Sequence, residues 1–345
     1  MRPIKAIRVL IVDDSLLFRQ TLLTNLKKDP YIDVVGTAVD SFDAMNKITE
    51  LAPDVVTLDI EMPQMNGIDF LKKLLPQKKL PVVVVSSLPI NAFEALDAGA
   101  VDFVSKPRID SSNALNSFVS ELSTKIKIAS MAKVNKAPAK SPIAHKKLTA
   151  DASDNLIIAI GASTGGTEAI LEVIKMLPPT TPGIVIVQHM PPIFTKMYAQ
   201  RLDKNCQMHV KEAEDGDRIT KGQIIIAAGE HHLRLQQDRQ GYFIRSAKGE
   251  KVSGHCPSVD VLFDSVAEIA GPRAIGVILT GMGADGAKGL LKMRQAGAYT
   301  IGQDKESCVV YGMPMVAFNI GGVSKQLPLQ QISNEIISYL NQQKS

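Results

Sequence analysis

Short apolar runs alternate with helix-length amphipathic segments from residue 7 to residue 104. Strict alternation of this kind predicts a parallel sheet with helices on both of its faces. We therefore predict an α/β fold of the doubly wound type, with five parallel strands, for this part of the chain. The apolar runs are IRVLIV (7–12), IDVVGTA (32–38), DVVTL (54–58), PVVVV (81–85) and VDFV (101–104), and the segments between them are 15–28, 41–51, 67–75 and 89–97.

Polar side chains follow four of these runs, at the sheet edge where ligands of such folds bind. Asp13 and Asp14 follow the first run, Asp59 the third, Ser86 the fourth and Lys106 the fifth. One aspartate after a strand is usually a turn or helix-cap residue, but here three carboxylates converge. Carboxylates with water suit Mg²⁺, and beside the metal Asp59 could attack a phosphoryl group whose oxygens Lys106 and Ser86 stabilise. The pattern predicts a magnesium-dependent acyl phosphate site.

The same segments resemble the receiver domain of response regulators over about residues 5–122. The motifs concerned are VLIVDDS, VVTLDIEMPQMNGIDFL, PVVVVSS and AGAVDFVSKP. The resemblance implies that Asp59 is the phosphoacceptor, that Asp13 and Asp14 join it around Mg²⁺, that Ser86, Phe103 and Lys106 form the switch, and that the Lys106–Pro107 bond is cis. One departure is visible: the short spacing between Ser86 and Gly99 predicts a fourth helix that is short or begins abruptly.

The segment LIIAIGASTGGTEAILEVIKML (156–177) predicts a strand, a tight Gly-x-Ser-x-Gly turn and an amphipathic helix. Gly161 and Gly165 permit a sharp backbone path that exposes Ser163 near a helix N-terminus, where N–H groups can stabilise an oxyanion. Ser163 is therefore a candidate nucleophile. On the pentapeptide alone, a serine that only caps the helix is an equally good interpretation.

A base and a carboxylate are available at the same predicted sheet edge. His189 directly follows the apolar run GIVIVQ (183–188), and Asp285 lies in the turn after AIGVILT (274–280). A histidine at a strand end is usually structural, but His189 could accept the Ser163 proton while Asp285 holds its ring. The three strand ends together favour a Ser-His-Asp triad. The other five histidines, which are less suited, are His145, His209, His231, His232 and His255.

A competing motif occupies residues 281–286. Gly281, Gly283 and Gly286 match Gly-x-Gly-x-x-Gly between a predicted strand and helix, and Asp304 follows the next predicted strand. The alternative function is thus a receiver-controlled enzyme that binds a nicotinamide or flavin dinucleotide. We expect it less, because the motif lies near the end of the sequence, with little room for the rest of a dinucleotide-binding half.

Most of residues 154–335 resemble the chemotaxis protein-glutamate methylesterase. The motifs are IGASTGG, VQHMPPIFTKMYAQRLD, EAEDGDRITKGQIIIAAGEHHLRL, PSVDVLFDSVA, GVILTGMGADGAKGL and VVYGMPMVA. The resemblance implies that Ser163, His189 and Asp285 hydrolyse glutamate methyl esters and deamidate glutamines on chemoreceptors, without a cofactor in this domain, and that a chemotaxis histidine kinase phosphorylates the receiver. Thr164 and Met282 are candidate oxyanion donors. Cys256 departs from the arginine that many members have at that position.

The charge distribution suggests the domain organisation. Lys and Arg number 13 against 16 Asp and Glu in residues 1–124, 7 against 1 in 125–153, and 19 against 18 in 154–345. We therefore expect a receiver domain at 1–124, a basic flexible linker at 125–153, and a larger, mostly parallel α/β hydrolytic domain at 154–345. A nearly neutral second domain does not favour nucleic acid as a partner.

Two further expectations concern the cellular environment. Three cysteines without a CxxC pair indicate neither a disulfide framework nor a zinc site. No apolar run has the length of a membrane span, so we expect no membrane insertion. Both features favour a cytoplasmic protein.

Overall fold

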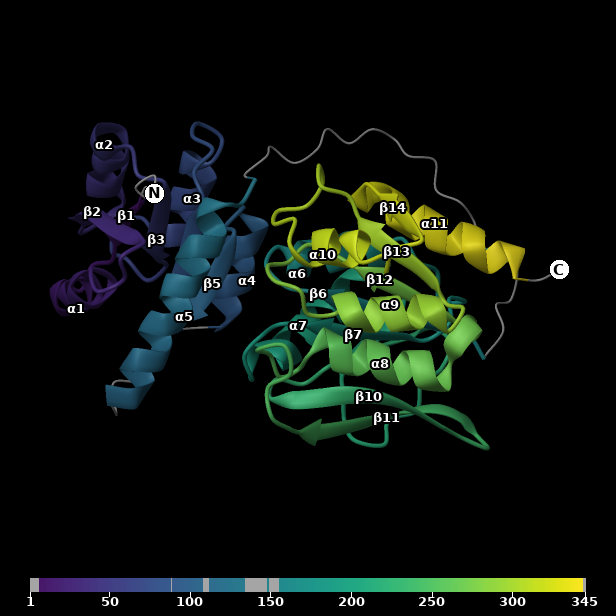
Figure 1. The fold of residues 1–345 in the computed structure, drawn as a ribbon. Coiled ribbons are helices and arrows are strands. Elements are labelled where there is room, and N and C mark those ends of the chain that lie inside the picture. Colours follow the sequence, from purple (N-terminus) through teal and green to yellow (C-terminus); the bar gives the residue numbers. More distant parts are fainter. Residues whose placement is uncertain (1–5, 88, 108–111, 134–147, 149–154, 344–345) are drawn as a thin grey trace. The chain divides into compact units, whose positions relative to one another are not determined.

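The computed structural model describes residues 6–87, 89–107, 112–133, 148 and 155–343 (Figure 1). These residues form two compact units, one within Met1–Ala139 and the other within Lys140–Ser345. Each unit has its own parallel sheet, which confirms the predicted fold class of two doubly wound α/β domains.

The first unit is a five-stranded parallel sheet in the order β2-β1-β3-β4-β5. Strands β1, β3 and β4 lie in the middle and are almost entirely buried, as expected of strands covered on both faces. The elements are β1 (Ile7–Val12), α1 (Leu16–Leu26), β2 (Ile32–Ala38), α2 (Ser41–Leu51), β3 (Val55–Asp59), α3 (Gly67–Leu74), β4 (Val82–Ser86), α4 (Pro89–Asp97), β5 (Asp102–Ser105) and α5 (Ser112–Ser130).

Short polar side chains cap the N-termini of three helices in this unit. Ser15, Asp40 and Asn66 accept hydrogen bonds from backbone N–H groups in the first turns of α1, α2 and α3. Each cap satisfies donors that an α-helix leaves unpaired at its N-terminus. The strand ends and the helix starts are thereby fixed together, which positions the residues between them.

Helix α5 continues past the predicted boundary at residue 124. Lys125, expected in the linker, donates from Nζ to Asp102 Oδ1 (2.8 Å) and to the carbonyl oxygen of Phe103 (2.6 Å). Ile126 and Ala129 are buried and continue the apolar face of the helix. The basic charge therefore begins on a folded helix, and the predicted linker residues 134–147 and 149–153 lie outside the described residues.

Two details of the receiver resemblance had different outcomes. Helix α4 has nine residues, as the spacing before Gly99 predicts. The cis bond expected at Lys106–Pro107 was wrong: within the described part of the chain, the cis peptide bond precedes Pro257 instead. The trans form is the intrinsically favoured state of an X-Pro bond, so a resemblance alone is weak support for a cis bond.

The second unit is a seven-stranded parallel sheet in the order β14-β13-β12-β6-β7-β9-β8, with a separate antiparallel hairpin, β10-β11. Helix α8 packs against both β10 and the sheet (Figure 1). Its buried side chains join one apolar core. The elements are β6 (Ile157–Ala162), α6 (Gly166–Ile174), β7 (Ile184–Gln188), α7 (Phe194–Asn205), β8 (His209–Glu212), β9 (Gln223–Ile226), β10 (His231–Asp238), β11 (Gly241–Lys248), α8 (Val259–Ile269), β12 (Ala274–Ile278), α9 (Ala287–Gln295), β13 (Tyr299–Gln303), α10 (Met313–Asn319), β14 (Lys325–Leu327) and α11 (Leu329–Gln342).

Strand order reverses between β1 and β3 in the first unit and between β6 and β12 in the second. In open α/β sheets, ligands bind outside the carboxyl ends of the strands at this point. In the second sheet Gly161 pairs with Ile278 on one side and Val187 on the other, so three strands end nearly level. The topology therefore places one candidate site in each unit.

The cysteines and the helices bear on the expected environment. Cys206, Cys256 and Cys308 are thiols rather than members of disulfides. Among the described residues, none of the helices combines the length and the apolar content needed to cross a bilayer.

Truncation of Ile126 tests whether the end of α5 belongs to the folded first unit. Ile126 is fully buried, so Ile126→Ala should lower the free energy of unfolding of the first unit by about 2–5 kcal/mol. Thr124→Ala, an exposed position in the same turn, should change it by less than about 0.5 kcal/mol. Urea unfolding of the full chain, monitored by hydrogen exchange of β1 and β3, measures the change in unfolding free energy for both variants. Equal changes in the two variants would place residue 126 outside the core.

Candidate functional sites

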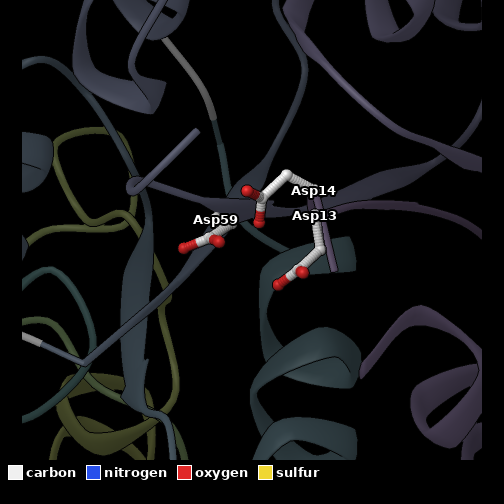
Figure 2. Close-up of side chains that lie close together, drawn as sticks. All are labelled: Asp13, Asp14 and Asp59. Carbon is white, nitrogen blue, oxygen red and sulfur yellow. The ribbon is translucent and has the colours of Figure 1, made fainter. Parts of the chain in front are cut away.

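Three carboxylates meet at the carboxyl edge of the first sheet (Figure 2). Asp13 and Asp14 follow β1, and Asp59 ends β3. One oxygen from each lies within 4.8 Å of the others. Asp13 and Asp59 are buried whereas Asp14 is exposed, so the cluster opens to solvent on one side. Carboxylates at this spacing, partly open to water, suit a divalent cation.

Lys106, at the end of β5, joins two of these carboxylates. Its Nζ lies 2.8 Å from Asp13 Oδ2 and 2.6 Å from Asp59 Oδ2. Burial raises the pKa of Asp13 and outweighs the opposing effect of Lys106. Burial alone would lower the pKa of Lys106, but the hydrogen bonds to the two carboxylates raise it above its ordinary value. The ammonium therefore stays charged beside Asp59.

The two other predicted switch residues are buried in the same unit. Ser86 ends β4 and pairs with Ser105 of β5, and its carbonyl oxygen accepts a hydrogen bond from the Lys106 N–H (2.9 Å). Phe103 lies against Phe93 of α4, with ring centroids 6.1 Å apart, and beneath the Lys125 ammonium. The structure therefore brings Lys106 to the carboxylates and packs Phe103 between the sheet and its helices.

Ser163 lies in the turn between β6 and α6, at the edge where the second sheet reverses. The next turn of chain is compact because Gly165 adopts a φ of +75°, a left-handed conformation that glycine accommodates readily. A Cβ on Gly281 would lie 2.7 Å from the Ser163 Cβ, so only glycine allows the turn after β12 to approach the serine. Gly165 and Gly281 thus allow the β6–α6 turn and the turn after β12 to pack closely around Ser163.

The His189 imidazole and the Asp285 carboxylate form a direct contact, with Nε2 and Oδ2 2.8 Å apart. Asp285 is buried at the N-terminus of α8, where it accepts hydrogen bonds from Ser258 Oγ (2.7 Å), Val259 N–H (2.8 Å) and Asp260 N–H (2.9 Å). Burial by itself would raise the pKa of Asp285, but the His189 contact and these donors hold it below its ordinary value. The group is therefore a stable buried anion beside the imidazole.

Gln188, the last residue of β7, connects the serine and histidine segments. Its Nε2 donates to the carbonyl oxygens of both Ser163 (2.9 Å) and His189 (3.1 Å). The His189 N–H also donates to the Ala162 carbonyl oxygen (3.2 Å). These bonds hold the backbones of the two candidate catalytic residues side by side.

The remaining ring nitrogen of His189 is available for chemistry. Nδ1 is buried and makes no hydrogen bond to any described residue. In the same part of the chain, no hydrogen bond joins the half-exposed Ser163 to the imidazole. Catalytic hydrogen bonds are often long before substrate binds. One face of the His189 ring stacks on His255, with centroids 3.6 Å apart and planes 12° from parallel.

The two predicted oxyanion donors lie in the turns around Ser163. Thr164 is buried, and its carbonyl oxygen accepts from Thr280 Oγ1 (3.1 Å). In the opposite turn, the Gly281 N–H already donates to the Val310 carbonyl oxygen (3.0 Å), whereas that of Met282 donates to none of the described residues. Within this turn, Met282 is therefore the better candidate.

Two of the three glycines of the competing dinucleotide motif have packing roles here. Gly281 admits Ser163, and a Cβ on Gly286 would lie 2.4 Å from Val259 of α8. Gly283 and Gly286 both have positive φ values, as this turn requires. The motif is therefore explained by the close packing of the β12 turn against the serine turn and α8.

Sequence analysis missed the residues that support His189 and Asp285. His255 and Ser258 are separated by long stretches of chain from the groups they contact, and Gln188, although next to His189, is distant in sequence from Ser163. The Ser258-Val-Asp pattern resembles a helix cap, which could have indicated the start of α8 but not that its N–H groups hold Asp285.

Comparison with known proteins defines the class. A response regulator receiver domain model matches residues 9–116, and a CheB methylesterase model matches residues 158–336. The chain is thus a response regulator whose second unit is an esterase domain. It belongs to the CheB methylesterase family.

Relatives of the chain match nearly its whole length. A protein-glutamate methylesterase/protein-glutamine glutaminase 2 from Syntrophomonas wolfei is 54% identical over 98% of this chain and 99% of its own. A protein of the same name from Pseudomonas aeruginosa is 44% identical over 96% of each chain. The crystal structure of the Thermotoga maritima CheB methylesterase catalytic domain is 42% identical, with a TM-score of 0.52, and covers 53% of this chain and 98% of that one.

Replacement of the buried carboxylate tests its electrostatic setting. Asp285→Asn should lower the free energy of unfolding of the second unit by about 1.5–3 kcal/mol at neutral pH, because charged hydrogen bonds are lost. The folded pKa is lowered, so the carboxylate's contribution is complete above the ordinary value of 3.8 and disappears as the pH falls through the folded value. The difference from the unsubstituted chain should therefore shrink in acid.

Denaturant unfolding of the full chain at several pH values, monitored by hydrogen exchange of β6 and β12, measures this difference in unfolding free energy. Asp215→Asn, at a carboxylate that is 45% exposed, is the control and should give a small difference at neutral pH. A difference for Asp285→Asn that grew in acid would contradict the lowered pKa.

Proposed function

We propose that the chain is a phosphorylation-regulated methylesterase and glutaminase that acts on glutamate methyl esters and glutamines of chemoreceptors. The names of its relatives support the two activities. The observation that carries the proposal is the His189–Asp285 contact at the strand-order reversal, with the Ser163 and His189 backbones joined through Gln188.

Nucleophilic attack by Ser163 begins the proposed reaction. Its hydroxyl adds to the ester carbonyl and transfers a proton to His189, with Nδ1 as the accepting atom because Nε2 faces Asp285. Asp285 maintains the Nε2–H tautomer and stabilises the imidazolium. Met282 N–H and the Thr164 backbone are the candidate donors to the tetrahedral oxyanion.

Collapse of this intermediate releases methanol, which takes the proton from His189 and leaves a glutamyl ester on Ser163. Water, deprotonated by His189, then hydrolyses this ester to glutamate. With a glutamine substrate, ammonia leaves in place of methanol. The same groups therefore serve both activities.

Control is assigned to the first unit. Asp13, Asp14 and Asp59 would hold Mg²⁺, which when bound neutralises the carboxylates and the incoming phosphoryl group. Asp59 is the proposed phosphoacceptor, with a chemotaxis histidine kinase as phosphodonor. Lys106, already at Asp59, would contact the phosphoryl oxygens, and Ser86 and Phe103 would convey the change. The reduced state of the three cysteines is compatible with the expected cytoplasmic location.

Ser163→Ala tests the nucleophile. Loss of the nucleophile from such a triad lowers turnover by about 10⁶-fold, so methanol release from a methylated chemoreceptor should fall to background. A fluorophosphonate should label Ser163 in the unsubstituted chain and no serine in the variant. Ser258→Ala, which keeps the nucleophile, should still be labelled, and normal methanol release by Ser163→Ala would refute the mechanism.

Asp59→Asn tests the control site. With Mg²⁺ and a small phosphodonor such as acetyl phosphate, the unsubstituted full chain should incorporate phosphate and release methanol faster, because a phosphorylated Asp59 shifts a two-state element. Asp59→Asn should do neither, and chelation of Mg²⁺ should have the same effect. Asp33→Asn, at an exposed β2 residue, is the matched control. Stimulation of Asp59→Asn by the phosphodonor would contradict the assignment.

A further inference from the structure

His255 lies against the catalytic imidazole without belonging to the proposed triad. It is in the connection between β11 and α8, and its ring lies nearly parallel to that of His189, with centroids 3.6 Å apart. A face-to-face contact this close covers one side of the base. The Asp285 contact, by comparison, restrains only one edge of the ring.

The connection that carries His255 is held at several points. Val252 and His255 exchange two backbone hydrogen bonds of 3.0 Å, and Ser253 Oγ donates to Asp260 Oδ2 (2.9 Å). Three residues after His255, Ser258 donates to Asp285. One continuous segment, residues 252–260, therefore contacts both the face of His189 and its carboxylate partner.

The charge of His255 suits this place. Burial, followed by the positive charge of His189, lowers the pKa of His255 to about 4. The charged or titratable groups that act on it are His189, Asp285 and Lys251. His255 is thus neutral near pH 7 and adds no second positive charge beside the base when that base accepts a proton.

We propose that His255 is a positioning residue of the esterase. Its ring stacks on the His189 imidazole and fixes the ring plane in which Nε2 meets Asp285 and Nδ1 remains open to the Ser163 proton. The terminal torsion of a histidine is intrinsically broad, so a flat neighbour is an effective restraint on tilting. This inference rests on the proposed triad and adds to it a requirement for a ring, rather than a hydrogen-bonding group, at position 255.

Two substitutions in the full chain separate these requirements. His255→Phe keeps a flat ring and removes the nitrogens, whereas His255→Asn keeps polar groups and removes the ring. The probes are a peptide with a glutamate γ-methyl ester, for kcat and KM, and a fluorophosphonate, for the rate of Ser163 labelling. His255→Asn should lower kcat and the labelling rate about tenfold, equivalent to about 1.4 kcal/mol in the barrier, with KM nearly unchanged.

His255→Phe should stay within about twofold of the unsubstituted chain in both rates. Equal rates in all three proteins, equal losses in both variants, or loss confined to His255→Phe would each overturn the inference. Thermal unfolding verifies that both variants fold, and His255→Tyr and His255→Gln replace any variant that does not. Failure of the unsubstituted chain to be labelled at Ser163 would refute the proposed function instead, so the two failures are distinct.

Discussion

A parallel sheet that is covered on both faces confines chemistry to the ends of its strands. In both units the strand interiors are buried and apolar, and polar side chains converge where the strand order reverses. Asp13 and Asp59 meet at the β1–β3 reversal, and Ser163 and Asp285 follow the two strands of the β6–β12 reversal. Both units therefore place their site at the strand-order reversal of a parallel sheet. The first site has a cluster of carboxylates, and the second has a single buried carboxylate.

The two sites differ in how they stabilise negative charge. The first has an ammonium group, since Lys106 contacts two carboxylates at once. In the second, among the residues that the structure describes, no lysine or arginine pairs with Asp285; backbone N–H groups at the start of α8, a hydroxyl and the imidazole hold it instead. Fixed dipoles stabilise an anion without a full positive charge that would oppose protonation of His189. That difference suits a cation and phosphate site in the first unit and proton transfer in the second.

The sequence predicted what depends on strand ends and missed what depends on long-range packing. Five site residues follow apolar runs, so the parallel pattern alone places them at the carboxyl edges of the two sheets. They are Asp13 and Asp59 in the first unit, and Ser163, His189 and Asp285 in the second. The supports are different in kind: Ser258 and His255 reach their partners only because α8 packs on the sheet, which no local pattern reveals. The extent of α5 was missed because lysines suggested a linker, although Ile126 and Ala129 continue its buried stripe.

Segment 252–260 runs from exposed residues to the core of the second unit, where Val259 is fully buried. It crosses from a surface hairpin to a buried helix start, and its first residues are exposed. Local openings of such connections require less free energy than global unfolding. Local opening of its first residues, 252–255, would leave the sheet and the start of α8 in place while the imidazole lost its stacked neighbour. Mild denaturants or heat would then inactivate the enzyme reversibly, well before the protein melts.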